Sequence, residues 1–273
     1  MKFLNQRASL KCSAKRQQDW FHSVVGQEIL AAEKQLVESL LGPLDQNHKP
    51  VDVTREQSIQ IAPCSNALVN IEYWPPLTPV VCDPIPPLPS EMIIADGAEL
   101  PLVPDNTRLL VIHHLCDFSD HPQQIIREAI LTLAPEGKLV VIGFNPISLW
   151  GLWRFVSLWF NPMPWRANFI RPQRMTDWLT LLNCDIDHKK FIVYKPAIKQ
   201  HWLTHKFGFI GMLAERYNLP FGAVYVITAT KKTRARTPIR NRWKRPELKP
   251  LILPKPSFNH VDSDPQRNAE QKS

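Results

Sequence analysis

The chain has 273 residues, of which 44% are apolar and 21% charged, a composition that supplies a buried core and excludes wholesale disorder. Its net charge of +8 belongs to one end, because residues 231–255 hold ten Lys or Arg against one acid while residues 1–230 hold 21 of each sign. Five widely spaced cysteines without a C-x-x-C pair exclude a zinc ribbon and a disulfide framework, and we expect a reducing compartment.

The first hundred residues contain one long helical pattern and three short strand patterns. Apolar residues recur every three or four positions from Asp19 to Leu41, which predicts an amphipathic helix that Gly42-Pro43 ends. A short helix is expected at Asn66–Tyr73, whereas the proline-rich crossover Pro84–Pro89 excludes an ordinary helix. The predicted strands are Ser58–Ala62, Val80–Cys82 and Met92–Ala95.

Residues 108–229 alternate strand and helix patterns. The spacing of apolar residues predicts helices at Pro122–Leu133 and near Pro172–Leu182, and Pro135-Glu136-Gly137 predicts a turn. Strands are predicted at Arg108–His113, Lys138–Phe144, Lys190–Tyr194 and Ala223–Ala229. Seven strands that alternate with helices predict an α/β fold, a mostly parallel sheet with helices on both faces.

Two acids follow predicted strands, where ligands of open α/β sheets bind. Asp83 comes 21 residues after Ala62, a spacing typical of an acid that binds ribose hydroxyls, although it could equally begin a proline turn. Asp96 precedes Gly97 and could accept a hydrogen bond from an adenine amino group. Its alternative is an Asx turn.

Several short segments of the sequence, taken in chain order, resemble the segments of one protein family. Asp96-Gly-Ala-Glu-Leu-Pro-Leu102 resembles the D-x-x-x-L-P-F segment of class I S-adenosylmethionine (SAM)-dependent methyltransferases of the type 11 branch, and His113–Leu139 resembles the family's fourth strand, helix and fifth strand. Three more runs resemble a narrower bacterial subgroup, the uncharacterised YafS-like methyltransferases: Gly143–Gly151, Arg171–Leu179 and Phe221–Tyr225. The resemblance covers about residues 20–243. It implies a Rossmann-like sheet with one antiparallel strand and methyl transfer from SAM to an unknown acceptor.

The resemblance also implies a cofactor site. The family's loop after the first strand has the pattern G-x-G-x-G, whereas Ile59–Asn66 contains no glycine. Side chains at these positions narrow the space for a ligand, and Pro63 removes a backbone donor. Two interpretations stay open: SAM bound along a shifted path, or a methyltransferase-like scaffold that has lost its cofactor. The implied cofactor residues are Ala62, Pro63, Cys64, Asp83, Asp96, Gly97 and His113.

Other side chains are candidates for catalysis and acceptor binding. His114 is the candidate general base, because imidazole titrates near neutrality, and a hydrogen-bonded structural histidine is its alternative. Asn145, Trp150 and Trp153 are candidates for binding the acceptor, which we expect to be apolar. We expect SAM as the cofactor and no metal, since the pair at residues 201 and 205 lacks an acid or cysteine at matching spacing.

The predicted layout has three parts: a basic segment (1–17), a methyltransferase-like domain (18–230) and a basic, proline-rich, disordered tail (231–273). Within the domain, the tryptophan-rich residues 146–170 predict a lid over the acceptor, an interfacial membrane segment or a core helix. The run Lys231–Lys255 could bind RNA or anionic membranes, or only aid solubility. The longest apolar stretch has 14 residues, too short to cross a bilayer. We therefore expect a cytoplasmic protein, which could also bind peripherally to a membrane.

Overall fold

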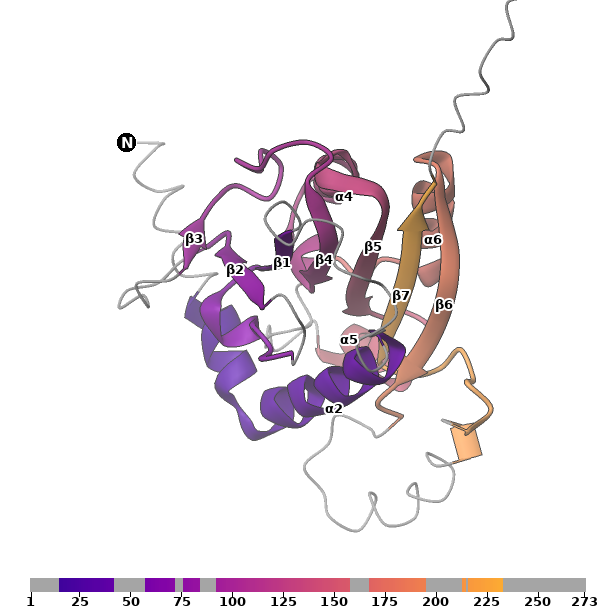
Figure 1. Ribbon diagram of the computed structural model, residues 1–273. Coiled ribbons are helices and arrows are strands. Elements are labelled where there is room, and N and C mark those ends of the chain that lie inside the picture. The colour runs from indigo at the N-terminus through magenta and orange to yellow at the C-terminus, as the bar shows by residue number, and fades with distance from the viewer. Residues whose placement is uncertain are drawn as a thin grey trace, which may run out of the picture. The chain divides into compact units, whose positions relative to one another are not determined.

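The computed structural model describes residues 15–41, 57–71, 76–83, 92–157, 167–194, 213–214 and 216–232 (Figure 1). Several predictions fall outside these residues and stay predictions. They concern most of the basic N-terminal segment, the crossover Pro84–Pro89, the pair of histidines at 201 and 205, and the tail from residue 233 onward.

A seven-stranded sheet forms the centre of the molecule, with the order β3-β2-β1-β4-β5-β7-β6 (Figure 1). Strand β7 runs antiparallel to both of its neighbours, and the other pairs are parallel. The predicted seven strands and mostly parallel sheet are therefore confirmed. The strands are β1 Gln57–Ala62, β2 Leu77–Val81, β3 Ile93–Ile94, β4 Thr107–His113, β5 Leu133–Phe144, β6 Cys184–Ile192 and β7 Val224–Lys231.

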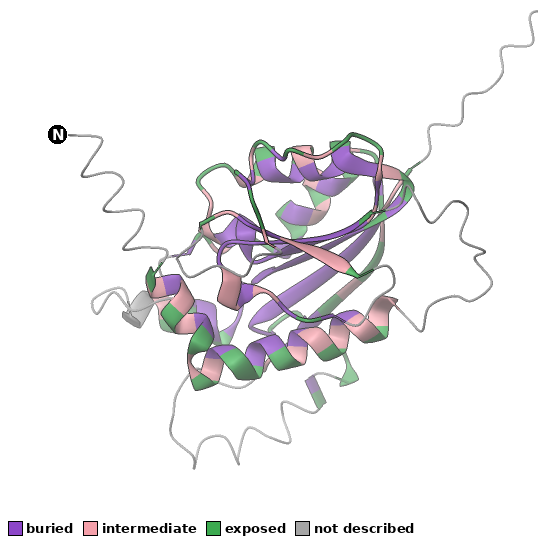
Figure 2. Cartoon of the chain, turned by 60° about the vertical axis from the view of Figure 1, so that its left-hand side comes forward, coloured by how far each residue is buried: buried purple, intermediate pink, exposed green. Residues whose placement is uncertain are grey.

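The central strands are apolar on both faces because each face is covered. In β4, Leu110 and Ile112 belong to one buried cluster, while Leu109 and Val111 belong to the other. Alternate residues of a strand point to opposite faces, so a continuous apolar run fits a sheet enclosed on both sides. Figure 2 shows the buried strands between two layers of helices.

Helices cover the two faces unequally. α4 and α6 pack on the face that carries the first cluster, and α2 packs on the face that carries the second. Trp150 of α5 also belongs to the second cluster. The helices are α2 Val24–Leu41, α3 Leu115–Phe118, α4 Pro122–Thr132, α5 Leu149–Ser157 and α6 Pro172–Leu181, with a 3-10 turn, η1, at Ser65–Ala67.

The helix expected from Asp19 to Leu41 is bent near its start. Residues 15–22 are helical, Ser23 interrupts, and α2 then continues to Leu41. The Ser23 hydroxyl donates to the Trp20 carbonyl (2.6 Å) and accepts from the Gly26 amide (3.2 Å). A Cβ at Gly26 would lie 2.4 Å from that same carbonyl, so only glycine permits this tight bend.

Two local predictions were wrong. The helix expected at Asn66–Tyr73 is reduced to η1, because both backbone groups of Val69 face the side-chain amide of Gln60 (2.7 and 2.9 Å) instead of helical partners. The turn expected at residues 135–137 lies within β5, which begins at Leu133 and pairs with Thr107. Glu136 takes a left-handed φ of 65° there, which marks an irregularity in the strand.

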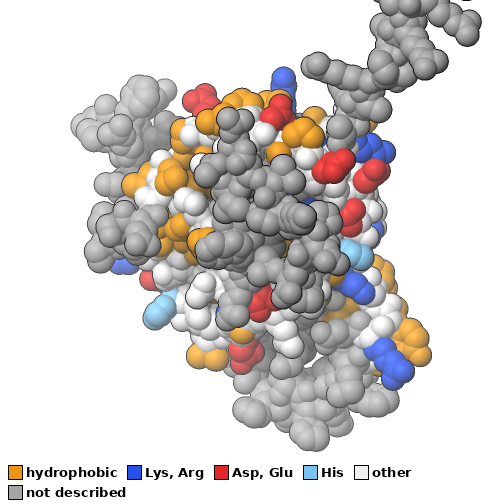
Figure 3. Space-filling model, in the orientation of Figure 1, with side chains coloured by type: hydrophobic (Ala, Val, Ile, Leu, Met, Phe, Trp, Pro, Cys, Tyr) orange, Lys and Arg blue, Asp and Glu red, His pale blue; other side chains and the backbone are white. Residues whose placement is uncertain are grey.

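The sheet ends at a very short edge strand. Both residues of β3, Ile93 and Ile94, are exposed, and Figure 3 shows apolar side chains gathered on that side of the molecule. A two-residue edge offers little backbone for pairing with another chain. Among the described helices, none has the length and apolar character to cross a membrane.

Candidate functional site

The strand order reverses between β1 and β4, and the crevice at such a point is where open α/β sheets bind ligands. The loop after β1 begins this site. Its residues Ala62, Pro63 and Cys64 are buried, and η1 follows directly. The loop without glycines therefore packs into the protein and does not lie open over the strand ends.

A buried cluster of four ionisable side chains fills the crevice. Glu33 of α2 contacts both histidines at the end of β4: its Oε2 lies 2.7 Å from His113 Nε2 and its Oε1 lies 2.8 Å from His114 Nε2. Asp117 Oδ2 lies 3.1 Å from His114 Nδ1 and accepts a hydrogen bond from the Phe144 amide (2.9 Å). All four side chains are inaccessible to solvent.

The backbone conformation of His114 makes this convergence feasible. Consecutive residues of a strand point to opposite faces, so two neighbouring histidines on β4 could not share one partner. His114 leaves the strand with a left-handed φ of 52°, which turns its ring to the side where His113 lies. The His113 Nδ1 atom contacts the Ala67 carbonyl of η1, so the cluster also fastens the loop after β1 to the end of β4.

The cluster holds opposite charges close together. Burial alone would raise the pKa of Glu33, but the charges of His114 and His113 outweigh it and lower this pKa to about 2. Burial would lower the pKa of His114, but the charge of Glu33 and the hydrogen bond to Asp117 raise it to about 9. A histidine that is buried and already protonated at neutral pH is a poor acceptor of protons. This geometry does not favour the general-base role expected of His114.

Within the cluster, the Asp117 carboxylate is the group whose burial is least offset by hydrogen bonds and neighbouring charges. Burial raises its pKa, and the neighbouring His114 only partly opposes this effect. Its second carboxylate oxygen, Oδ1, is buried and has no hydrogen-bond partner among the described residues. Such an oxygen is costly to bury unless positive charge lies nearby.

The two expected acids lie beside this crevice, at the ends of β2 and β3. Asp83 and Asp96 are exposed. Desolvation by neighbouring atoms, and then the charge of Asp96, raise the pKa of Asp83, so the charge of one carboxylate acts on the other. The Asp83 amide donates to the Pro63 carbonyl (2.9 Å), which joins the loops after β1 and β2.

Asp96 forms the Asx turn that was the alternative to adenine binding. Its Oδ1 accepts from the Ala98 amide (2.9 Å), and its other oxygen stays available to a ligand in this geometry. The next residue, Gly97, is buried, and a Cβ there would lie 2.8 Å from a Leu115 methyl group. A larger residue at position 97 would therefore require the Leu115 side chain of α3 to shift.

The three residues expected to bind an acceptor differ in how far they are buried. Asn145 is buried, and its amide donates to the carbonyls of Pro220 and Gly222 (2.9 Å each). Trp150 is buried in the second cluster, whereas 39% of Trp153 is exposed. The structure therefore brings Asn145 and Trp150 into the protein interior and leaves Trp153 for surface contacts.

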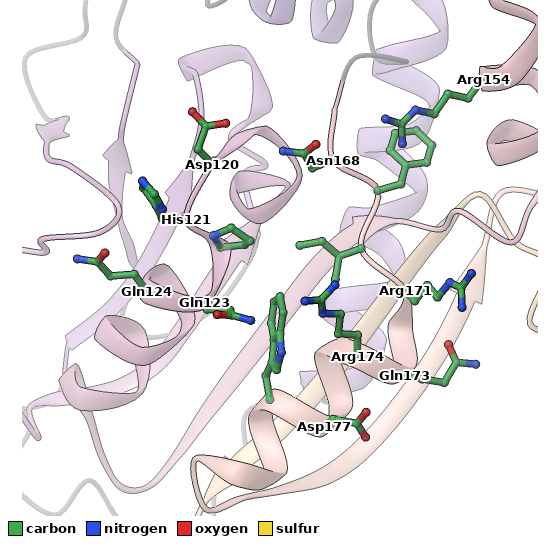
Figure 4. Close-up of a pocket in the computed structure, with 14 residues that line it drawn as sticks. Asp120, His121, Gln123, Gln124, Arg154, Asn168, Arg171, Gln173, Arg174 and Asp177 are labelled. Carbon is green, nitrogen blue, oxygen red and sulfur yellow. The ribbon is translucent and has the colours of Figure 1, made fainter. Parts of the chain in front are cut away.

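A cavity that the sequence did not indicate lies between the starts of α4 and α6 (Figure 4). It measures about 980 Å³, and its wall includes three arginines, Arg154, Arg171 and Arg174, against the acids Asp120 and Asp177. Two of these arginines fall in the run Arg171–Leu179, but their convergence with Arg154 of α5 depends on the fold. The lining has an excess of positive charge.

The four described cysteines are free and should react slowly. Burial raises the pKa of Cys64 to about 11 and that of Cys82 to about 12, and it also raises the pKa values of Cys116 and Cys184. The thiolate is the reactive form, so at pH 8 a thiol reagent should modify folded Cys64 about 100-fold more slowly than in urea. The measurement is absorbance in a C12S variant, because Cys12 lies outside the described residues. Fast modification of any thiol in that folded variant would contradict the prediction.

Comparisons with known proteins agree with the fold. No protein-family model matches the chain. A SAM-dependent methyltransferase of Thermotoga maritima, described as a possible histamine N-methyltransferase, is 15% identical with a TM-score of 0.53, over 81% of this chain and 98% of that one. A SAM-dependent methyltransferase of Archaeoglobus fulgidus is 14% identical with a TM-score of 0.42, over 72% of this chain and 94% of that one. The chain has the Rossmann-like fold of class I SAM-dependent methyltransferases.

A sequence relative has also been found. The uncharacterised protein YafS of Escherichia coli K12 is 28% identical over 160 residues. The match spans 58% of this chain and 63% of the relative's length.

Proposed function

We propose that the chain is a SAM-dependent methyltransferase that binds the adenosine part of SAM along the ends of β2 and β3. The observation that carries the proposal is the pair of exposed carboxylates, Asp83 and Asp96, just after β2 and β3 beside the switch point of a methyltransferase fold. Asp83 would accept hydrogen bonds from the ribose hydroxyls and Asp96 one from the adenine amino group.

The methyl acceptor would occupy the cavity between α4 and α6. Its three arginines favour an acceptor with a negatively charged group. The wall also holds Phe169, Ile170 and Trp178, which suit an apolar portion of the same molecule. A search for acceptors should therefore begin with amphipathic acids.

Calorimetric titration of the full chain with SAM and with S-adenosylhomocysteine tests the proposal, and the wild type should bind both. Asp96→Ala should weaken SAM binding about 10- to 100-fold, since a charge-assisted hydrogen bond contributes about 1.5–3 kcal/mol. Asp96→Asn should weaken it similarly, although the asparagine oxygen keeps the turn to Ala98. The control is Asp185→Ala, an exposed acid on β6 at the opposite edge of the sheet. Unchanged affinity in both Asp96 variants would refute this placement.

A second function is favoured by the buried loop. Ala62, Pro63 and Cys64 leave little room beside β1, and Glu33 and His113 close the crevice between β1 and β4. A scaffold that binds no SAM would have this form. Absence of heat from either ligand, with a folded sample at high concentration, would favour the scaffold over the enzyme.

A further inference from the structure

We infer that Glu33, His113 and His114 form a binding site for one divalent cation of the zinc class. Their ligand atoms lie within 4.8 Å of one another and come from two elements far apart in sequence, α2 and the end of β4. Two imidazoles and a carboxylate are a set that zinc accepts. The inference does not rest on the proposed function, because metal binding can be measured without SAM.

The hydrogen bonds around the histidines orient them as metal ligands are oriented. A carbonyl oxygen can only accept, so His113 must donate to Ala67 through Nδ1–H. His114 contacts the Asp117 carboxylate through Nδ1 in the same way. Ligating histidines usually give their second ring nitrogen to a carbonyl or a carboxylate. Both Nε2 atoms are thereby left to face Glu33.

The close contacts between these nitrogens and Glu33 are stable only if a positive charge lies between them. An Nε2 lone pair and a carboxylate lone pair repel each other at the 2.7–2.8 Å seen here, so each contact needs a proton or a shared cation. One divalent ion can serve both contacts once it displaces the proton from His114 Nε2, since the two oxygens of Glu33 each face a different ring. A bidentate Glu33 and two histidines would then supply four donor atoms from the protein alone.

The surroundings match a closed, structural metal site. Glu33, His113 and His114 are fully inaccessible to solvent. Two carboxylates, Glu33 and Asp117, balance the charge of a divalent ion, and the ion would also attract the unpartnered Oδ1 of Asp117. Bonds of about 2.0–2.1 Å would set each Nε2 about 3.3 Å from the Glu33 oxygen that it faces, so each of these two contacts has to lengthen by about 0.5 Å. The two Nε2 atoms, which lie within 4.8 Å of each other, have to reach the same ion. The ion would fasten α2 to the strand ends.

The test begins with the full-length wild type, freed of metal with a chelator and loaded with zinc sulfate. Elemental analysis after removal of free zinc should find one zinc per chain, and zinc should raise the melting temperature. Loading with cobalt(II) in place of zinc should produce the visible absorption of a four-coordinate ion. A wild type that retains no zinc, shows no shift in melting temperature and gives no cobalt spectrum would overturn the inference.

Variants then assign the ligands. Glu33→Gln and His114→Gln should lose the bound zinc, and the control His188→Gln, at an exposed histidine on β6, should keep it. Asp117→Asn, which alters a positioning residue, should weaken zinc affinity about 10- to 100-fold. If the ligand variants fail to fold, two other measurements test the site. One is the zinc affinity of Asp117→Asn, and the other is the presence of nitrogen couplings in the electron paramagnetic resonance spectrum of copper(II)-loaded wild type. Zinc retained by folded Glu33→Gln would place the metal elsewhere and refute the site.

Discussion

Replacing Glu33 by alanine is expected to lower the free energy of unfolding by about 3–5 kcal/mol. The substitution removes the carboxylate that contacts both His113 and His114, and it leaves two imidazoles buried without their shared acceptor. Breaking a buried ion pair from one side costs this much because the remaining charge cannot return to water. The loss of packing between α2 and β4 acts in the same direction.

Urea unfolding in the presence of EDTA measures this effect without any contribution from a metal. The matched control is Glu28→Ala, an exposed position on the same helix, where a change within about 0.5 kcal/mol is expected. Glu33→Gln should fall between the two, because the amide keeps the shape and one acceptor but not the charge. A loss below about 1 kcal/mol for Glu33→Ala would show that the cluster does not hold α2 to the sheet.

Replacing Asn145 by alanine is expected to cost about 2–3 kcal/mol of stability. The Asn145 side chain donates to the carbonyls of Pro220 and Gly222 (2.9 Å each), makes a longer contact with the Ile147 carbonyl (3.4 Å) and accepts from the amide of Ile147 (3.0 Å). The three shorter bonds contribute about 1 kcal/mol each, and the substitution leaves the carbonyl of buried Gly222 without this donor. These bonds join the end of β5 to the segment that enters β7.

Thermal unfolding of Asn145→Ala, with Asn168→Ala as control, checks this prediction. Asn168 is exposed and its amide makes a single long contact of 3.4 Å to Ser119, so its loss should be nearly neutral. Asn145→Asp should be at least as harmful as alanine, because a carboxylate would face two carbonyl oxygens. An Asn145→Ala protein with unchanged melting temperature but without methyl transfer would favour the acceptor-binding role predicted from its position after β5.

The sheet was predictable because its central strands contain uninterrupted runs of apolar residues. The runs that became the middle of β4 and the main part of β5 are continuous and apolar, as strands enclosed on both faces must be. The short helix expected at Asn66–Tyr73 failed for a tertiary reason, since Gln60 on β1 takes up the backbone groups of Val69. No local pattern predicts such a contact.

The candidate site was predictable only in part. His113 and His114 stand out because they follow a strand, but Glu33 lies 80 residues before His113, and only the fold brings them together. One signal was present in the sequence. Glu33 follows Ile29 by four positions and precedes Val37 by four, so it occupies the buried face of an amphipathic helix. A charged residue on such a face is rarely buried without a partner.

The place of β7 has a consequence for synthesis of the protein. Among the described strands β7 is the last in chain order, yet it lies between β5 and β6. Until Val224–Lys231 has left the ribosome, β5 keeps an open edge and β6 has no partner. Open strand edges invite pairing with other chains and capture by chaperones. A chain truncated before Val224 would keep this edge permanently, so the sheet can close only after β7 has been synthesised.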